Sequence, residues 1–302
     1  MTTSLVTGGC GFIGSHIVDK LVSLDHKVRI IDDLSAQENL EFYFNEKENN
    51  SVTYHHEDIS KIDCSSIFRN VDYVFHLAAR SRIQPTIGSP GECFEVNVVG
   101  TQRVLEWSRM HSVKKVVYSG TSSLYGHQNS IPFQPNMPTD CLNPYSMSKW
   151  MGEQVCKLYS QLYDLPTIVL RYFNVYGPRE PIKGQYAPVI GLFKRQNKNG
   201  EHMTIVTPGD QRRDFTYIDD VVDANICAMS TNIQHDIYNV GTGKNYSMWD
   251  LAKMIHSGSA VPVTFIPERP AEVFETLADI SRTTKDLGWE PKYSLEDKIN
   301  EY

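Results

Sequence analysis

The chain has 302 residues, of which 40% are hydrophobic and 22% are charged, the composition of an ordinary folded globular protein. This length allows one large α/β domain, or one such domain and a smaller lobe. The formal net charge of −7 and the lack of a long basic run disfavour nucleic acid as the main partner. An anionic small molecule is still compatible with this charge, because it needs only a local cationic pocket.

The six cysteines are scattered, with neither C-x-x-C pairs nor the spacing of zinc ligands. We therefore expect reduced thiols in a cytoplasmic protein without a metal site. The first residues run directly into a predicted strand, so we expect no signal peptide. No apolar run reaches the ~18 residues that a membrane-spanning helix needs, so we expect no membrane partner.

A glycine-rich turn lies between a short predicted strand, residues 4–7, and a predicted amphipathic helix, residues 15–23. Its glycines have G-x-x-G-x-x-G spacing. Glycines so spaced permit a tight turn and let a pyrophosphate approach the backbone, while the following helix supplies amide donors. The pattern predicts a dinucleotide site formed by Gly8, Gly11, Phe12, Ile13 and Gly14.

The next predicted strand, residues 28–31, ends in Asp32 and Asp33. An acid about 20 residues after such glycines accepts hydrogen bonds from a ribose 2′-hydroxyl and repels the 2′-phosphate of NADP. We therefore predict that Asp32 and Asp33 help to bind NAD. For Asp33 alone, a solvated loop acid is an equal alternative.

Strands and helices continue to alternate, which predicts an α/β fold with a doubly wound parallel sheet, the Rossmann fold. Strands are expected at 53–55, 73–77, 115–119 and 167–171, with helices over 93–110 and from residue 144. Ligands of such sheets bind beyond the carboxyl ends of the strands. The candidate cofactor contacts near strand ends are Asp58, Ile59, Leu77, Ala78 and Ala79.

Prolines and glycines interrupt this rhythm after residue 174. We expect a Rossmann domain of residues 1–173 plus about 210–240, which includes a returning helix over 216–231. A smaller C-terminal substrate-binding lobe is expected from about 174–209 plus 241–302.

The strongest candidate for catalysis is Tyr145, followed four residues later by Lys149. Asn143 and Pro144 predict a helix start, which places Tyr145 in the first turn with Lys149 on the same face. A free Tyr titrates near ~10, but a lysine charge and the helix N-terminus both favour the phenolate. Such a Tyr takes a proton from a sugar or alcohol hydroxyl. Taken alone, the pair also fits an ordinary surface helix.

Several motifs, in the same order, resemble the extended short-chain dehydrogenase/reductases and, within them, the nucleotide-sugar epimerases. They are residues 7–16, 76–79 and 97–101, Tyr145-x-x-x-Lys149, and residues 170–179, followed by 213–215 and 269–270. The resemblance implies a tightly held NAD and a nucleotide-sugar substrate. It also implies a homodimer joined through two helices per subunit, here within 93–110 and 145–163.

By this resemblance Tyr145 is the acid/base, Lys149 lowers its pKa and holds the nicotinamide ribose, and Thr121 completes a triad. The resemblance adds three cofactor contacts, namely Asn97, Ser119 and Tyr172. For the nucleotide sugar it implies contacts from Thr121, Asn174, Arg213, Arg269 and Glu272, the last replacing a usual Asp.

Ser122 and Ser123 stand where related dehydratases carry an acid pair and related decarboxylases a Glu. The resemblance therefore favours redox-neutral 4-epimerisation of a UDP-hexose, either UDP-glucose/UDP-galactose or the N-acetylated pair. The small Thr276 leaves room for an N-acetyl group. Arg82 instead suits the carboxylate of UDP-glucuronate if it points inward. A 4-keto-sugar reductase and a non-catalytic NAD-binding protein are further alternatives.

Overall fold

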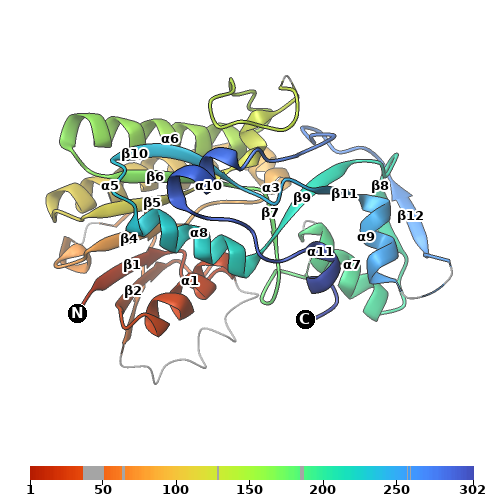
Figure 1. The fold of residues 1–302 in the computed structure, drawn as a ribbon, viewed down its shortest axis with the longest axis horizontal. Coiled ribbons are helices and arrows are strands. Elements are labelled where there is room, and N and C mark those ends of the chain that lie inside the picture. The colour runs from red at the N-terminus through yellow and green to blue at the C-terminus, as the bar shows by residue number, and fades with distance from the viewer. Residues whose placement is uncertain (37–50, 63–64, 128, 184–186, 257, 259) are drawn as a thin grey trace.

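The computed structural model describes residues 1–36, 51–62, 65–127, 129–183, 187–256, 258 and 260–302. Its centre is the predicted doubly wound parallel sheet, with helices on both faces (Figure 1). The strand order is β10-β6-β5-β4-β1-β2-β3. Because the order reverses between β1 and β4, a crevice is expected at the carboxyl ends of these strands. The strands are β1 (Thr3–Thr7), β2 (Lys27–Asp32), β3 (Val52–His56), β4 (Tyr73–His76), β5 (Lys115–Thr121), β6 (Thr167–Tyr172) and β10 (His235–Val240).

Both faces of the sheet are buried, since successive side chains of a strand point to opposite faces. On one face, Val6 lies opposite Ile30 of β2 and Phe75 of β4. These side chains share a hydrophobic core with α1 (Phe12–Ser23) and α8 (Ile218–Ser230). This core fixes the glycine turn, because the turn joins β1 directly to α1.

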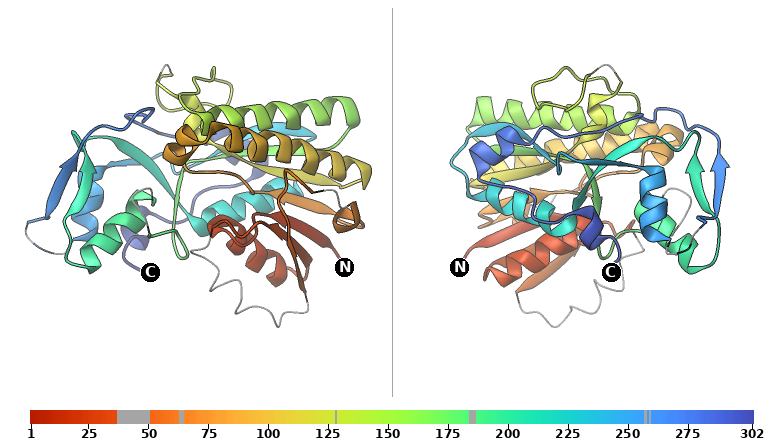
Figure 2. Two further views of the ribbon diagram at one scale, coloured as in Figure 1. Left: turned by 180° about the vertical axis from the view of Figure 1, so that it is seen from behind. Right: turned by 45° about the vertical axis from the view of Figure 1, so that its right-hand side comes forward.

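The opposite face carries a second core, to which the neighbouring strand residues Leu5 and Val74 contribute. Here the sheet packs against α5 (Thr101–Met110) and α6 (Pro144–Tyr163). These two helices run side by side along the sheet (Figure 2). The predicted start of α6 at Pro144 is confirmed.

Two predicted helix boundaries differ from the structure. The first helix begins at Phe12 rather than Ser15, because Gly11 itself is the N-cap residue and the glycine turn passes without a break into the helix. The helix expected over 93–110 is three segments: α4 (Pro90–Phe94), a π-helical turn (Glu95–Gly100) and α5. Such wide turns are frequent at functional sites.

Smaller sheets and helices lie at one end of the molecule (Figure 1). A three-stranded sheet contains β7 (Asn174–Tyr176), β9 (Arg212–Tyr217) and β11 (Asn245–Ser247), and a two-stranded sheet contains β8 (Met203–Val206) and β12 (Val263–Ile266). The helices α7 (Val189–Lys198) and α9 (Met248–Ile255) pack against these strands.

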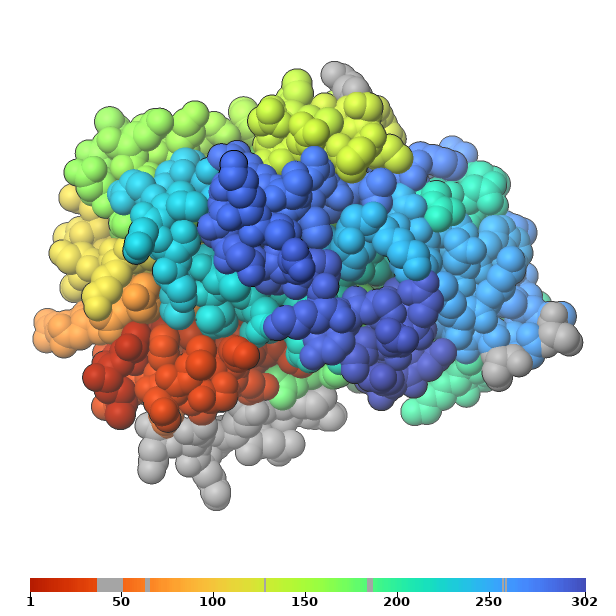
Figure 3. Space-filling model, viewed as in Figure 1, coloured from red at the N-terminus to blue at the C-terminus, as the bar shows by residue number. Residues whose placement is uncertain are grey.

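The C-terminal segment is shared between the two ends of the molecule. The helix α10 (Ser281–Leu287) packs against β10 and α8 of the larger part, whereas α11 (Leu295–Lys298) lies against β9. In Figure 3 these last residues, in dark blue, lie across the middle of the molecule. The helix α10 thus packs on the large sheet, and the expected division of the chain into two parts stays a prediction.

Among the described residues, no helix is both long enough and apolar enough to cross a membrane.

Candidate active site

A cleft of about 620 Å³ runs across the carboxyl ends of β2, β1, β4, β5 and β6 and reaches the smaller sheets. Every site residue predicted from the sequence lines it, except Asn97. On the side of the glycine turn these are Gly8, Gly11, Phe12, Ile13, Gly14, Asp32, Asp33, Asp58, Ile59, Leu77, Ala78, Ala79, Ser119 and Tyr172. Towards the smaller sheets they are Thr121, Tyr145, Lys149, Asn174, Arg213, Arg269 and Glu272.

The glycine turn is so tightly folded that side chains are excluded from it. A Cβ on Gly14 would lie 2.1 Å from the carbonyl oxygen of Gly8, and a Cβ on Gly8, whose φ is +70°, would lie 2.7 Å from the Ala78 nitrogen. Among the described residues, no side chain caps the N-terminus of α1 at Gly11. The amides of this first turn border the cleft, so the turn fits the pyrophosphate of a dinucleotide.

The two predicted ribose acids have different surroundings. The backbone N–H groups of Cys10 and Leu34 donate to the Asp32 carboxylate at 2.9 and 2.8 Å. Burial raises the pKa of Asp32, although these hydrogen bonds act in the opposite direction. Asp32 thus ties the end of β2 to the glycine turn while it borders the cleft.

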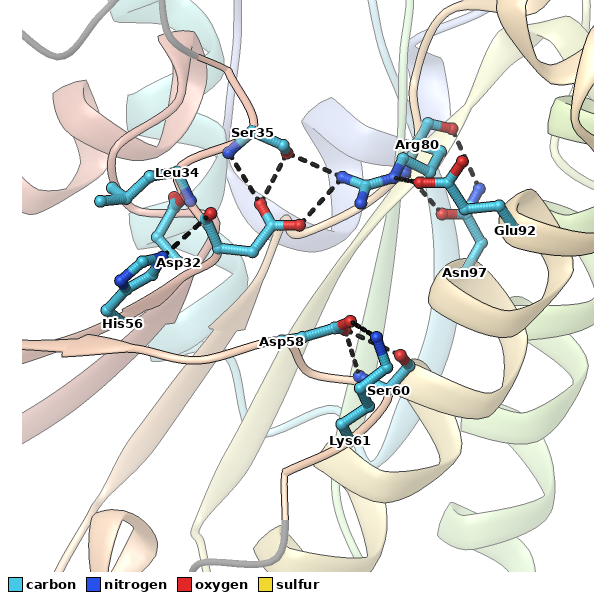
Figure 4. A network of polar contacts seen from close by, with 11 residues as sticks. Asp32, Leu34, Ser35, His56, Asp58, Ser60, Lys61, Arg80, Glu92 and Asn97 are labelled. Carbon is cyan, nitrogen blue, oxygen red and sulfur yellow. Dashed lines mark hydrogen bonds and ion pairs between the residues drawn. The ribbon is translucent and has the colours of Figure 1, made fainter.

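Asp33 is more open and is held by Arg80 at 3.0 Å and by Ser35. Both of these partners are labelled in Figure 4. Partial burial opposes ionisation, but the Ser35 hydrogen bonds and the Arg80 charge together lower the pKa of Asp33. The sequence reasoning missed Arg80 and Ser35. The one signal for Arg80 was its place four residues after His76, the last residue of β4.

Unlike the other predicted cofactor residues, Asn97 does not line the cleft. Its side chain is buried, and its Oδ1 accepts from the Arg80 amide at 2.7 Å. Its Nδ2 donates to the Arg80 carbonyl and to the Ser148 hydroxyl on α6. These bonds join the π-helical turn that carries Asn97 to Arg80 and to α6.

The proton-transfer candidates gather where α6 begins. The Asn143 Oδ1 accepts from the Ser146 amide at 2.8 Å, and Ser146 returns the contact, which completes a capping box around Pro144. This cap fixes the first turn of α6. It therefore directs Tyr145 and, one turn later, Lys149 into the cleft.

Burial changes the acidity of both side chains. It lowers the pKa of Lys149 to about 8, so this lysine is mostly protonated at neutral pH, with its Nζ 4.3 Å from the centre of the Tyr118 ring. Burial raises the pKa of Tyr145, and a hydrogen bond with Thr121 only partly offsets it. Desolvation therefore dominates the acidity of this phenol, and the predicted effect of Lys149 on it stays a prediction.

Thr121 stands at the end of β5 and accepts from the Ser123 amide at 3.2 Å. Ser122 and Ser123 also border the cleft, so hydroxyl groups occupy the place beside Thr121.

Tyr172 is a second phenol of the cleft. Burial raises the pKa of Tyr172 to about 12, and its hydroxyl accepts a hydrogen bond from the Ser119 hydroxyl. Tyr172 therefore remains protonated and does not compete with Tyr145 for proton transfer.

A buried ion pair that the sequence reasoning missed lies beneath this group. Glu153 of α6 and Arg171 of β6 meet at 2.8 Å, and both side chains are almost fully buried. Arg171 also donates to the Tyr125 hydroxyl at 2.9 Å and to the Pro135 carbonyl at 3.0 Å. The pair thus joins α6 to β6 and to the segment that carries Pro135.

Two of the residues predicted to bind the nucleotide sugar, Arg213 and Glu272, contact each other. Arg213 donates to the carbonyl oxygens of Arg212 and Phe274 and reaches the Glu272 Oε1 at 3.5 Å. The second oxygen of Glu272 is buried and has no hydrogen-bond partner among the described residues. It is available to a ligand hydroxyl. Thr276 is buried beside them, and its Oγ1 accepts from the Asp214 amide at 3.3 Å.

Glu180 is a further cleft residue that the sequence reasoning missed. Its Oε1 accepts from the Tyr302 hydroxyl at 2.8 Å, whereas its buried Oε2 lacks a partner among the described residues. Burial raises the pKa of Glu180 to about 7, against the opposing effects of Tyr302 and Lys194. The folded protein thus binds this proton more tightly than the unfolded chain does.

We expect Glu180→Gln to raise the free energy of unfolding at pH 8 by on the order of 2 kcal/mol relative to the wild type. A carboxyl group whose pKa is higher in the folded than in the unfolded state stabilises the fold at pH values below its unfolded pKa. This contribution is lost as the pH rises through the folded pKa of about 7. The gain should therefore vanish at pH 5, where Glu180 is protonated. Urea unfolding at both pH values measures it, with the exposed Glu290→Gln as a control. An equal effect of Glu180→Gln at pH 5 and pH 8 would contradict the assignment.

Comparison with known proteins identifies the family. Residues 4–241 match the model of the NAD dependent epimerase/dehydratase family. A UDP-glucose 4-epimerase of Mycolicibacterium smegmatis is 34% identical over 303 residues, which cover 98% of this chain and 96% of that protein.

Solved structures agree with this match over nearly the whole length. The UDP-N-acetylglucosamine 4-epimerase of Methanobrevibacter ruminantium M1, in complex with UDP-N-acetylmuramic acid, is 33% identical with a TM-score of 0.93, covering 99% of this chain and 96% of that one. The UDP-glucuronic acid 4-epimerase of Bacillus cereus, with UDP-glucuronic acid and NAD, is 30% identical with a TM-score of 0.92 and the same coverage. The chain belongs to the NAD dependent epimerase/dehydratase family.

Proposed function

We propose that the protein is an NAD-dependent 4-epimerase of a UDP-hexose that works through a 4-keto intermediate. The observation that carries this proposal is the meeting of Tyr145, Lys149 and Thr121 in one cleft, with Ser122 and Ser123 beside them. An elimination or a decarboxylation needs an additional acid or base at this place, which these serines do not supply. A redox-neutral inversion needs only one group that exchanges a proton.

Bound NAD would supply the reversible oxidation of the sugar carbon. Tyr145 removes the proton from the O4 hydroxyl and returns one to the same oxygen after the sugar has presented its other face. The Lys149 ammonium favours the phenolate through its charge, provided that it remains protonated. Thr121 holds the phenol by a hydrogen bond. In this proposal Tyr145 transfers the proton, and Lys149 and Thr121 align it.

We further propose that the predicted residues divide the cleft between the two ligands. The glycine turn, Asp32, Asp33 and the strand ends would hold NAD on residues 1–173 plus about 210–240. The rest of the chain would hold the nucleotide sugar. There Arg213 and Arg269 suit a diphosphate, since guanidinium groups bind phosphate oxygens in pairs. The unpartnered Glu272 oxygen suits a ribose hydroxyl.

The favoured sugars are the glucose/galactose and the N-acetylglucosamine/N-acetylgalactosamine pairs. UDP-glucuronate is the second candidate because Arg82 lines the cleft. NMR of the purified protein with UDP-glucose, UDP-N-acetylglucosamine or UDP-glucuronate, without added cofactor, tests all three. Appearance of the matching galacto-epimer identifies the substrate. If no epimer forms even with added NAD, the proposal is wrong and a reductase becomes the better reading.

We also propose a cytoplasmic homodimer. The free thiols of the described cysteines suit a reducing compartment. The helices α5 and α6 expose large apolar side chains, among them Leu158 at 47% and Leu162 at 64% exposure. Their four-residue spacing places them on one face of α6. A second copy of this chain would cover this face.

We expect the double change Leu158→Glu/Leu162→Glu to convert a dimer into a monomer at micromolar protein. Charges buried in an apolar interface lack solvation and partners. Sedimentation equilibrium measures the mass. Leu24→Glu, an equally exposed leucine next to α1, is the control and should stay dimeric. A wild-type monomer, or an unchanged mass for the double variant, would refute this interface.

A further inference from the structure

A single arginine spans the cleft at the end where the ribose acids lie. The Arg80 Nη1 is 3.0 Å from the Asp33 Oδ2 and donates to the Ser35 hydroxyl at 2.7 Å. Its Nε donates to Glu92 of α4 at 2.7 Å. Figure 4 shows the guanidinium between the loop that follows β2 and the helix α4. The side chain therefore bridges two walls that are far apart in the sequence.

The backbone of Arg80 is held independently of these ion pairs. Asn97 binds both its amide and its carbonyl, and the same Asn97 amide group donates to Ser148 on the catalytic helix. The Arg80 side chain is 28% exposed, so it is partly shielded from solvent. The backbone of Arg80 is therefore fixed, and only its side chain can exchange one binding partner for another.

Asp33 follows the strand that reads the adenosine ribose in a Rossmann fold, where a carboxylate accepts from the 2′-hydroxyl. A group within ion-pair distance of that carboxylate lies close to any substituent on the 2′-oxygen. A guanidinium is the preferred partner of a phosphate. In this chain, however, two carboxylates already bind the Arg80 guanidinium. Asp33 contacts its Nη1, and Glu92 contacts its Nε.

We propose that Arg80 determines cofactor specificity in two ways. It slows the release of NAD, because it holds Asp33 and Ser35, at the adenosine end of the site, against α4. It is also a latent 2′-phosphate site, which Asp33 and Glu92 keep occupied. The proposal rests on the NAD site of the proposed function, but it is independent of which sugar the protein epimerises. A failure of the sugar assays would leave it untouched.

Nucleotide content tests the proposal without using activity. Each purified variant is equilibrated with equal concentrations of NAD and NADP and separated from free nucleotide. The bound nucleotide is then released with acid and quantified by chromatography. We expect Asp33→Ser to raise the bound NADP:NAD ratio by at least about tenfold, the size of one charge-assisted hydrogen bond. Asp33→Ser/Arg80→Gln should return the ratio to within a few-fold of the wild type.

The double variant separates this proposal from simple relief of repulsion. If removing the Asp33 charge were sufficient, Asp33→Ser/Arg80→Gln would keep the gain in NADP, and the latent site would be disproved. No gain in a folded Asp33→Ser protein, judged by circular dichroism, would disprove it as well.

The rate at which NAD is released tests the first of these two roles of Arg80. Arg80→Gln should release bound NAD about tenfold faster than the wild type in an exchange experiment with labelled NAD, whereas Arg80→Lys, which keeps the charge, should lie in between. Equal exchange rates for the wild type and for Arg80→Gln would overturn this part. A melting curve of each variant with saturating NAD reports whether the chain is folded.

Discussion

Replacing Tyr145 by Phe is expected to lower kcat for epimerisation by about 10²- to 10⁴-fold, the usual contribution of a positioned acid/base. The change removes one oxygen and keeps the ring that fills the wall of the cleft. Tyr172, the other phenol near the strand ends, has a pKa raised to about 12 and does not replace it. NMR or a coupled assay with the identified UDP-hexose measures the loss.

Bound nucleotide should remain unchanged in Tyr145→Phe, because the predicted contacts to the pyrophosphate and the adenosine lie on other elements. Tyr163→Phe makes the same chemical change on the same helix at a half-exposed position, and it should keep normal turnover. A Tyr145→Phe protein that retained more than a tenth of the wild-type rate would require another acid/base in the cleft.

The sequence predicted the parts of the site that depend on local chemistry. The Asn143 and Pro144 cap places Tyr145 and Lys149 correctly, since capping uses residues that are adjacent in the chain. The glycine turn is located correctly for the same reason. Strand ends also gathered as predicted, because parallel strands carry their carboxyl ends to one edge of a sheet.

Contacts between distant segments could not be predicted from one sequence. Glu153 and Arg171 are 18 residues apart on different elements, and Arg80 lies 47 positions after Asp33. Each pair forms because the sheet order brings two elements together. The spacing of residues along the sequence does not reveal such a contact. The spacing likewise reveals that a lysine follows Tyr145 by one helical turn, but it does not reveal the burial that raises the pKa of this phenol.

Glu153→Gln is expected to lower the free energy of unfolding by about 3–5 kcal/mol, the cost of leaving one partner of a buried ion pair alone. Glutamine has nearly the same shape, so the space beside Gly120 stays filled while the charge is removed. The Arg171 guanidinium then keeps its hydrogen bonds to Tyr125 and Pro135 but loses the carboxylate that balances it. Urea unfolding monitored by circular dichroism measures the difference.

The matched control is Glu296→Gln, which removes one partner of the exposed pair with Lys244 and should cost less than about 1 kcal/mol. The double change Glu153→Met/Arg171→Met removes both buried charges together and should recover most of the stability lost in Glu153→Gln, since no unpaired charge remains. It should not recover kcat, because Arg171 also joins β6 to the Tyr125 turn beside Thr121. A double variant as unstable as Glu153→Gln would mean that shape, and not charge balance, makes this pair necessary. Recovery of both stability and kcat would mean that the pair has no part in aligning Tyr145 with Thr121.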